Sequence, residues 1–188
     1  MAAGMRAPSA GLQHTVVPTP LGDLTIVCST AGVVATSFDG DERDMELERV
    51  ISTRDGASHS AGSRADTAHP SARALARAAR REAESYFAGT RHTFSVSPDL
   101  SLVAGAFGRR VLEVVATIPY GELWTYGDVA GMAGSPRAAR AAGSALAGCP
   151  IELFVPCHRV VHASGTIGGY GRHEDRKRWL LRHEAAIE

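Results

Sequence analysis

The hydrophobic pattern of this chain changes near residue 100, and this change limits the folds open to it. Before that point, short runs rich in β-branched residues at 16–17, 24–28 and 33–38 are separated by turns containing Pro or Gly, which predicts three strands. After it, apolar residues recur at helical spacing from Phe107 to Ile118. The sequence therefore predicts a small sheet followed by a mainly helical half.

The rest of the first half predicts one long helix and several less regular segments. Residues 71–87 fit a helix that stops near a glycine, and residues 94–96 suggest a further short strand. A short helix is expected at 44–51. Residues 54–70 lack apolar periodicity and residues 1–13 resemble a loose tail, so we expect both segments to be mobile.

Charge and composition exclude some functions but select none. The 188 residues, 44% of them apolar, are enough for one domain or two small ones with a buried core. The formal net charge is zero, which argues against a surface that is basic throughout and binds nucleic acid without specificity. Basic residues exceed acidic ones only in residues 101–188, so this half is the better candidate to face an anion.

The three cysteines, Cys28, Cys149 and Cys157, form no CxxC motif, and this favours a reducing compartment over a disulfide framework. Cys28 has no second ligand at metal-site spacing, so we expect no metal, and no motif calls for another cofactor. No apolar run approaches membrane-spanning length, and the start lacks the apolar core of a signal peptide. These features predict a cytoplasmic protein with no membrane partner.

Two short helices with a tight turn between them are predicted in the second half. Thr125 and Asp128 form a capping-box pattern that opens the first helix. Ser135 and Pro136 suit the start of the next helix, which we expect to run to residue 147. This arrangement is a candidate helix-turn-helix.

Small side chains surround Arg137 and Arg140 in the second of these helices. Such a helix can approach another surface closely, and the narrow minor groove of DNA is one surface that requires it. An alanine-rich helix packed tightly on its neighbour explains the same pattern, so the helix alone does not decide between the two.

Residues 156–161 place a thiol beside an imidazole, Cys157 and His158, after an apolar run at 151–155 that resembles a strand. A thiolate is a nucleophile, and a histidine that accepts the thiol proton can activate it. Because sequence neighbours point in different directions, we expect His158 to reach the sulfur through a water or a bend. A buried structural cysteine beside a solvent-facing histidine is the alternative.

A last helix is predicted from residue 174 to about 184. Lys177 and Glu184 lie about two turns apart and hence on nearly one face of it. One cation and one carboxylate could thus face a common site. A solvated pair of surface charges is the alternative.

Together these motifs resemble the O6-alkylguanine-DNA alkyltransferases, repair proteins that move an alkyl group from guanine onto their own cysteine. The resemblance covers nearly the whole chain and is strongest from Phe107 to Glu184. In that part it is carried by IPYGE at 118–122, YGDVA at 126–130, AARA at 138–141, PCHRVV at 156–161, GYG at 169–171 and KRWLLRHE at 177–184. TPLG at 19–22 and YFAG at 86–89 are similar to the first domain of that family.

The resemblance implies a reaction and a role for each residue in it. Cys157 would be the nucleophile and alkyl acceptor, His158 its base acting through a water, and Glu184 the residue that orients His158. Tyr126 would donate to the departing guanine, and Lys177 would lie near the sulfur and the guanine oxygen. An in-line attack on the alkyl carbon cannot occur inside the base stack, so the target base must be flipped out.

The resemblance also implies which residues meet DNA. Arg140 would fill the gap that the flipped base leaves in a duplex bound through its minor groove. The other residues expected at the DNA are Arg137, Ala138, Ala139, Ala141, Gly143 and Tyr126. Those expected to form the substrate pocket are Val160, Tyr170 and Gly171. The implied partner is double-stranded DNA containing O6-alkylguanine, bound by a monomer without metal or cofactor.

The implied fold has two domains. Residues 1–100 would form an α/β domain, RNase H-like, with a small antiparallel sheet and a helix. Residues 101–188 would form a mainly α, winged-helix-like domain that contains the helix-turn-helix. Cys149 departs from the family, which usually has an Asn there to hydrogen-bond the link before the nucleophile. A thiol cannot copy the donors and acceptors of that amide.

Three other functions fit parts of the pattern. A non-catalytic protein that binds alkylated DNA, of the alkyltransferase-like type, would carry Trp in place of the acceptor cysteine, which Cys157 contradicts. A helix-turn-helix regulator would carry polar base-reading residues where this chain has alanines, and would need an effector domain. A cysteine hydrolase would require an oxyanion hole, for which the sequence offers no candidate.

Overall fold

The computed structural model describes residues 11–39, 70–170 and 173–188. The helix expected at 44–51, nearly all of the loop expected at 54–70 and most of the tail expected at 1–13 lie outside them, as does Gly171. Within the described residues, no helix is both long and apolar enough to cross a membrane.

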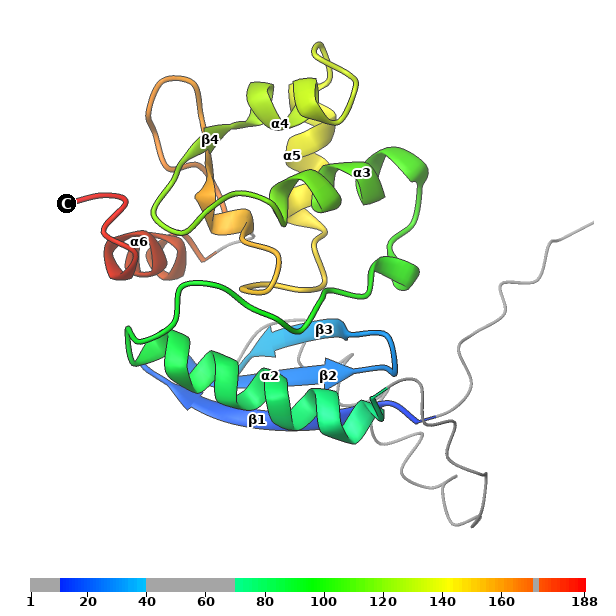
Figure 1. Ribbon diagram of the computed structural model, residues 1–188. Helices are drawn as coiled ribbons and strands as arrows, with labels where there is room; N and C mark the ends of the chain where they lie inside the picture. Colours follow the sequence, from blue (N-terminus) through cyan, green and yellow to red (C-terminus); the bar gives the residue numbers. More distant parts are fainter. Residues whose placement is uncertain (1–10, 40–69, 171–172) are drawn as a thin grey trace, which may run out of the picture.

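A small antiparallel sheet and one long helix form the first half of the molecule, in the lower part of Figure 1. The strands, adjacent in chain order, are β1 (Gln13–Thr19), β2 (Gly22–Cys28) and β3 (Val33–Phe38). All three strands predicted from the sequence are confirmed. The helix α2 (Ala72–Phe87) packs against β1 and β2, and its N-terminus is capped by the Ser71 side chain. Its buried face is mostly alanine, which allows close approach to the sheet.

The short strand expected at 94–96 is wrong. The Glu82 carboxylate, from α2, accepts hydrogen bonds from the backbone N–H groups of Ser95 and Val96 at 2.9 and 3.2 Å. These donors are therefore satisfied by a side chain rather than by a neighbouring strand. The chain just after this segment forms an isolated bridge to the sheet, between Val33 and Pro98.

The second half is mainly helical and lies above the sheet in Figure 1. Its helices are α3 (Ala106–Val115), α4 (Tyr126–Met132), α5 (Ala139–Ala147) and α6 (Glu174–His183). Two single-turn 3₁₀ helices, η1 (Leu100–Leu102) and η2 (Cys157–Arg159), join them. A two-stranded parallel sheet pairs β4 (Trp124–Thr125) with β5 (Val160–Val161). This order agrees with the change of pattern near residue 100.

The two helices of the predicted helix-turn-helix, α4 and α5, pack against each other. The capping box at Thr125 and Asp128 is present, as the sequence indicates. The predicted start of α5 is wrong by three residues, because Ser135 and Pro136 lie in a turn closed by a hydrogen bond from Ala138 N to Ser135 O at 2.9 Å. Proline at the second position of a turn is as favourable as proline in a first helical turn, so the sequence fits both.

The apolar run at 151–155 is buried, but it is not a strand. Leu153 has a φ of +73°, and the chain folds back so that Val155 N donates to Ile151 O at 3.0 Å. The segment docks on β3, where the Thr36 N–H and hydroxyl donate to the carbonyls of Pro150 and Glu152 at 2.8 and 3.0 Å. Contact with the first half therefore fixes the chain that leads to Cys157.

Candidate active site

Cys157 is the first residue of η2 and is 5% exposed. It lies at a pocket of about 480 Å³ between α5, the start of α4 and the loop before α6. The lining residues are Tyr126, Ala139, Arg140, Gly143, Ser144, Leu146, Ala147, Cys157, His162, Gly169 and Tyr170. Most of them are apolar or aromatic, with one thiol and few charges among them. Such a pocket suits a flat, largely apolar ligand held against the sulfur.

His158 is fully buried, and its two ring nitrogens differ in their surroundings. Nε2 lies 2.9 Å from Glu184 Oε1, whereas Nδ1 has no hydrogen-bond partner among the described residues. A carboxylate can only accept, so Nε2 carries the hydrogen and Nδ1 keeps its lone pair. Burial lowers the pKa of His158, and the Glu184 contact offsets this only in part. His158 is thus held as a neutral imidazole with its basic nitrogen available.

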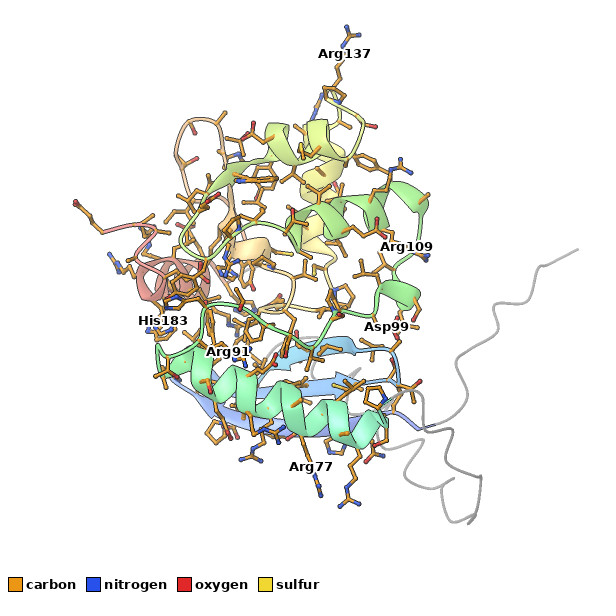
Figure 2. The ribbon with its side chains drawn as sticks, viewed as in Figure 1. Arg77, Arg91, Asp99, Arg109, Arg137 and His183 are labelled. Carbon is orange, nitrogen blue, oxygen red and sulfur yellow. The ribbon has the colours of Figure 1, made fainter. Side chains whose placement is uncertain are left out.

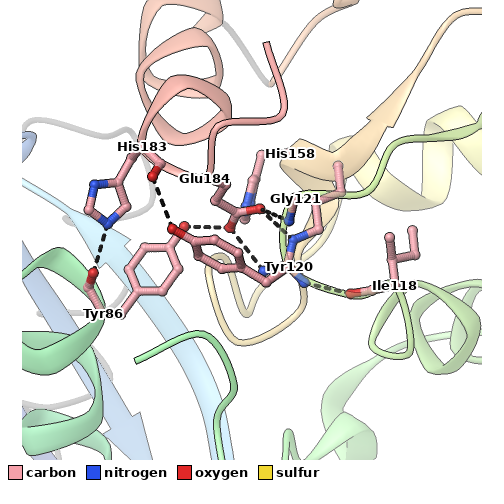
Figure 3. Close-up of polar contacts among 8 residues, drawn as sticks. Tyr86, Ile118, Tyr120, Gly121, His158, His183 and Glu184 are labelled. Atoms are coloured by element: carbon pink, nitrogen blue, oxygen red, sulfur yellow. Dashed lines mark hydrogen bonds and ion pairs between the residues drawn. The ribbon is translucent and has the colours of Figure 1, made fainter. Parts of the chain in front are cut away.

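Glu184 caps the end of α6, and its carboxylate contacts four residues (Figure 3). We call these residues together with Glu184 the Glu184 cluster: Tyr86, Gly121, His158, Arg159 and Glu184. Arg159 binds both carboxylate oxygens, at 2.8 and 2.9 Å, and Gly121 N donates to Oε2 at 3.2 Å. Burial opposes the charge, but the hydrogen bonds from His158 and Arg159 outweigh it and hold the pKa of Glu184 below its usual range. The carboxylate is therefore charged and fixed in orientation.

Lys177 also belongs to α6 and is fully buried, with Nζ donating to the backbone carbonyl of Val160. Burial lowers its pKa to about 8, and the neighbouring Cys157 counteracts this. Near neutral pH it therefore remains a cation beside the sulfur. The sequence prediction that Lys177 and Glu184 face one region agrees with this placement, since both contact residues 158–160.

Cys149 contacts Cys157, although the two lie on either side of the buried turn at 151–155. A hydrogen bond between the two thiols and the burial of Cys157 raise the pKa of Cys157 well above its usual value, and Lys177 opposes this effect. Cys149 is itself 1% exposed. Cys157 is therefore a thiol at rest, and it would need a base to become a thiolate.

Two tyrosines face the pocket from different elements. Tyr126, the first residue of α4, packs against His162 with ring centroids 5.1 Å apart. Gly143 of α5 lies beside the Tyr126 ring, where an added Cβ would be at an ordinary contact distance of 3.7 Å. Tyr170 is buried, and its hydroxyl has no partner among the described residues. Burial raises the pKa of both phenols, so both remain donors.

The helix α5 presents its small residues to the pocket, with Ala139, Gly143 and Ala147 on one face. Arg140 is exposed and lies at the rim. Arg137 is in the preceding turn rather than on the helix, and it projects away from the molecule (Figure 2). The other two residues expected at DNA do not line the pocket: Ala138 caps α5 and Ala141 is exposed.

Comparison with known proteins assigns the family. A sequence model of the 6-O-methylguanine DNA methyltransferase DNA-binding domain matches residues 106–186. Over 173 residues, which are 92% of both proteins, the chain is 36% identical to the methylated-DNA–protein-cysteine methyltransferase of Mycobacterium tuberculosis. This chain belongs to that family. A relative from Mycolicibacterium paratuberculosis is 49% identical over 96 residues, which cover 51% of this chain and 57% of that relative's own length.

Solved structures agree with this methyltransferase family assignment. The crystal structure of M. tuberculosis O6-methylguanine methyltransferase superposes with a TM-score of 0.71 at 31% identity, covering 94% of this chain and 95% of the other. The structure of M. tuberculosis OGT in complex with DNA gives a TM-score of 0.69 at 32% identity and covers 91% of each chain. The architecture of this methyltransferase family therefore extends over both halves of the chain.

Four residues of this family member's site were not predicted from the sequence. Arg159 follows His158 directly in the motif. Because a buried arginine needs a carboxylate partner, this position indicates a buried ion pair. Cys149 was noted only for departing from the family. His162 and Tyr86 gave no local signal, because the sequence does not show which distant elements they meet.

Proposed function

We propose that this chain repairs DNA by direct reversal, moving the alkyl group of O6-alkylguanine onto Cys157 in a single turnover. The thiol proton passes to His158 Nδ1 through a water, and the thiolate attacks the alkyl carbon. The S–C bond forms as the C–O6 bond breaks, and the electron pair stays with guanine. Tyr126 donates a hydrogen bond to the departing guanine, and the proton that left the thiol is the one that guanine gains in the overall reaction. The thioether does not revert, so each chain acts once.

The observation that carries the proposal is a buried thiol at an apolar pocket, next to a neutral histidine held by a charged carboxylate. Lys177 would stabilise the thiolate, since its charge already lowers the pKa of the sulfur. Tyr170 and Val160 would bound the guanine site, together with Gly171. Tyr126 suits hydrogen-bond donation, because burial raises the pKa of its phenol and keeps it protonated.

DNA is the partner in the solved M. tuberculosis OGT complex, and we extend this to a duplex carrying O6-alkylguanine here. Arg140 at the rim would enter the duplex from the minor groove and occupy the place of the flipped base. The small face of α5 would allow the close approach that this requires. A cytoplasmic monomer, an RNase H-like first domain at 1–100 and a winged-helix-like second domain at 101–188 belong to the same proposal.

The test is intact mass after incubation with an oligonucleotide duplex containing O6-methylguanine. We expect one methyl group per chain and no further addition with excess DNA. Trypsin cuts after Arg140 and Arg159, so Cys149 and Cys157 share one peptide, and fragmentation within it must place the methyl on Cys157.

Two variants sharpen this experiment. Cys157→Ser should bind the duplex but gain no mass, whereas Cys149→Ser should still be methylated. A chain that binds methylated duplex tightly without gaining mass would instead be a non-catalytic lesion-binding protein. Methyl on Cys149 or Cys28 would refute the assignment of the acceptor.

A further inference from the structure

Tyr86 is a buried side chain that connects the first half of the chain to the Glu184 cluster. It lies near the end of α2 and is fully buried. Its hydroxyl donates to Glu184 Oε1 at 2.6 Å, the same oxygen that accepts from His158 Nε2. Among the described residues it is the only donor to this carboxylate from before residue 106.

The surroundings of Tyr86 fix the position of its hydroxyl. Its ring packs against Phe87, Phe94 and Tyr120, with centroids 5.3, 5.5 and 6.1 Å away. Its backbone carbonyl accepts a hydrogen bond from His183 Nε2 at 2.7 Å (Figure 3). The ring and the backbone of Tyr86 are therefore both held, and they direct the hydroxyl at Oε1.

The chemistry of this contact favours a role in orienting Glu184. Burial and the Glu184 charge raise the pKa of Tyr86 far above its usual value, so its hydroxyl stays protonated and acts as a donor. A hydrogen bond to a charged group is stronger than one between neutral groups. Arg159 binds the carboxylate from one side and Tyr86 from another, which leaves Oε1 facing the imidazole.

We propose that Tyr86 is a positioning residue for alkyl transfer: its hydroxyl, supplied by the first half of the chain, holds the Glu184 carboxylate that orients His158. The inference rests on the proposed function and adds a residue outside the part of the chain matched by the DNA-binding domain. The first half would then contribute to reactivity as well as to stability.

The test is the variant Tyr86→Phe in the full chain, followed by single-turnover transfer from methylated duplex across pH. Phenylalanine keeps the ring packing and removes only the hydroxyl. We expect the maximal rate to fall on the order of tenfold, since a hydrogen bond to a charged group is lost. Duplex affinity should not change, because Tyr86 is fully buried and does not line the pocket beside α5.

The pH profile separates positioning from general destabilisation. With one donor fewer, the Glu184 charge is less dispersed and stabilises the imidazolium more, so the acid limb of the rate should move to higher pH. The titratable and charged groups that face His158 are Glu184 at the end of α6, Lys177 of α6, Arg159 beside it and the Tyr170 ring, with centroids 6.4 Å apart, and all four are retained. A purely structural role would lower the melting temperature without moving this limb.

Tyr120→Phe is the matched control. The Tyr120 hydroxyl donates to the backbone carbonyl of His183 at 2.9 Å, and its ring belongs to the same aromatic group, but it makes no hydrogen bond to Glu184. It should transfer with the rate and pH profile of the unchanged chain. In a Glu184→Gln background, Tyr86→Phe should add no further loss, because both changes act on one contact.

Two results would overturn the inference in different ways. If the unchanged chain transfers the alkyl group and Tyr86→Phe does so with the same rate and the same acid limb, only the role of Tyr86 is refuted. Absence of transfer by the unchanged chain would refute the proposed function and this inference with it.

Discussion

Cys149 shows how one residue changes the chemistry of its neighbour. Its thiol hydrogen-bonds Cys157 and, with burial, keeps the pKa of that sulfur high. We predict that Cys149→Ala lowers the pKa of Cys157, because this contact favours the protonated form. The pH midpoint for alkylation of Cys157 by iodoacetamide, followed by peptide mass, should move to lower pH.

Cys28→Ala is the control for this prediction. Cys28 is buried in β2, and burial raises its pKa to about 12, but it has no contact with the site. Replacing Cys28 should leave the pH midpoint for alkylation of Cys157 unchanged. A midpoint that is unchanged or higher in Cys149→Ala would mean that Cys149 does not control the resting thiol.

The sequence pointed to the candidate reacting residues but to few of the contacts that hold them. The motif at 156–161 indicated Cys157 and His158, and helical spacing placed Lys177 and Glu184 on one face. Although the arginine beside His158 indicates a carboxylate partner, the sequence could not predict that this partner is Glu184, nor that Tyr86 meets Glu184 and Cys149 meets Cys157. Such contacts depend on the path of the backbone between them, which hydrophobic periodicity does not contain.

At the scale of elements, α5 is the helix that we propose approaches DNA. We predict that Arg140→Ala slows transfer within a duplex on the order of tenfold or more, because unstacking the target base costs a few kcal/mol that the inserted arginine would offset. Transfer from free O6-methylguanine should be much less affected. Single-turnover rates on both substrates measure this difference.

Arg137→Ala provides a matched loss of charge in the turn before α5. It should weaken duplex binding and reduce its salt dependence, as expected for a phosphate contact, and leave the ratio of the two rates unchanged. If Arg140→Ala slowed both substrates equally, its role in replacing the flipped base would be wrong.

Elements with strong local signals were predicted correctly. The strands at 24–28 and 33–38, the helix α2 and the capping box of α4 all follow from residues close in sequence. The failures at 94–96, at 151–155 and at the start of α5 share a cause. At 94–96 and 151–155, residues outside the segment supply the partners of the backbone hydrogen bonds. At the start of α5, the proline is compatible with both a turn and a helix.

At the scale of the whole molecule, two of the contact regions between the halves adjoin the candidate site. At one, β3 pairs with residues 150–152, and Arg176 of α6 lies over the Phe38 ring at 4.3 Å. At the other, Tyr86 meets Glu184, 98 residues later in the chain. Both regions adjoin the segment that carries Cys157, so the halves should unfold together.

The charge of Glu184 makes this joint stability depend on pH. Its pKa is lowered in the folded chain relative to about 4.3 when unfolded, so as the pH falls the unfolded state binds the proton first. The stabilisation from Glu184 is therefore complete above that value and is lost below it. The lowered pKa of His158 acts in the same direction from about pH 6.5 downward.

We predict that Glu184→Gln lowers the free energy of unfolding at pH 7 by about 3 kcal/mol, since it leaves a buried arginine without its carboxylate. The decline in stability below pH 5 should also become shallower. Urea unfolding can be followed by the fluorescence of Trp124 and Trp179 in the second half and by pulsed labelling of Cys28 in the first. In Glu184→Gln, the unfolding midpoints from both signals should shift together to a lower urea concentration. Loss of the tryptophan signal while Cys28 stays protected would mean that residues 1–100 fold independently and that the contact between Tyr86 and Glu184 does not couple the halves.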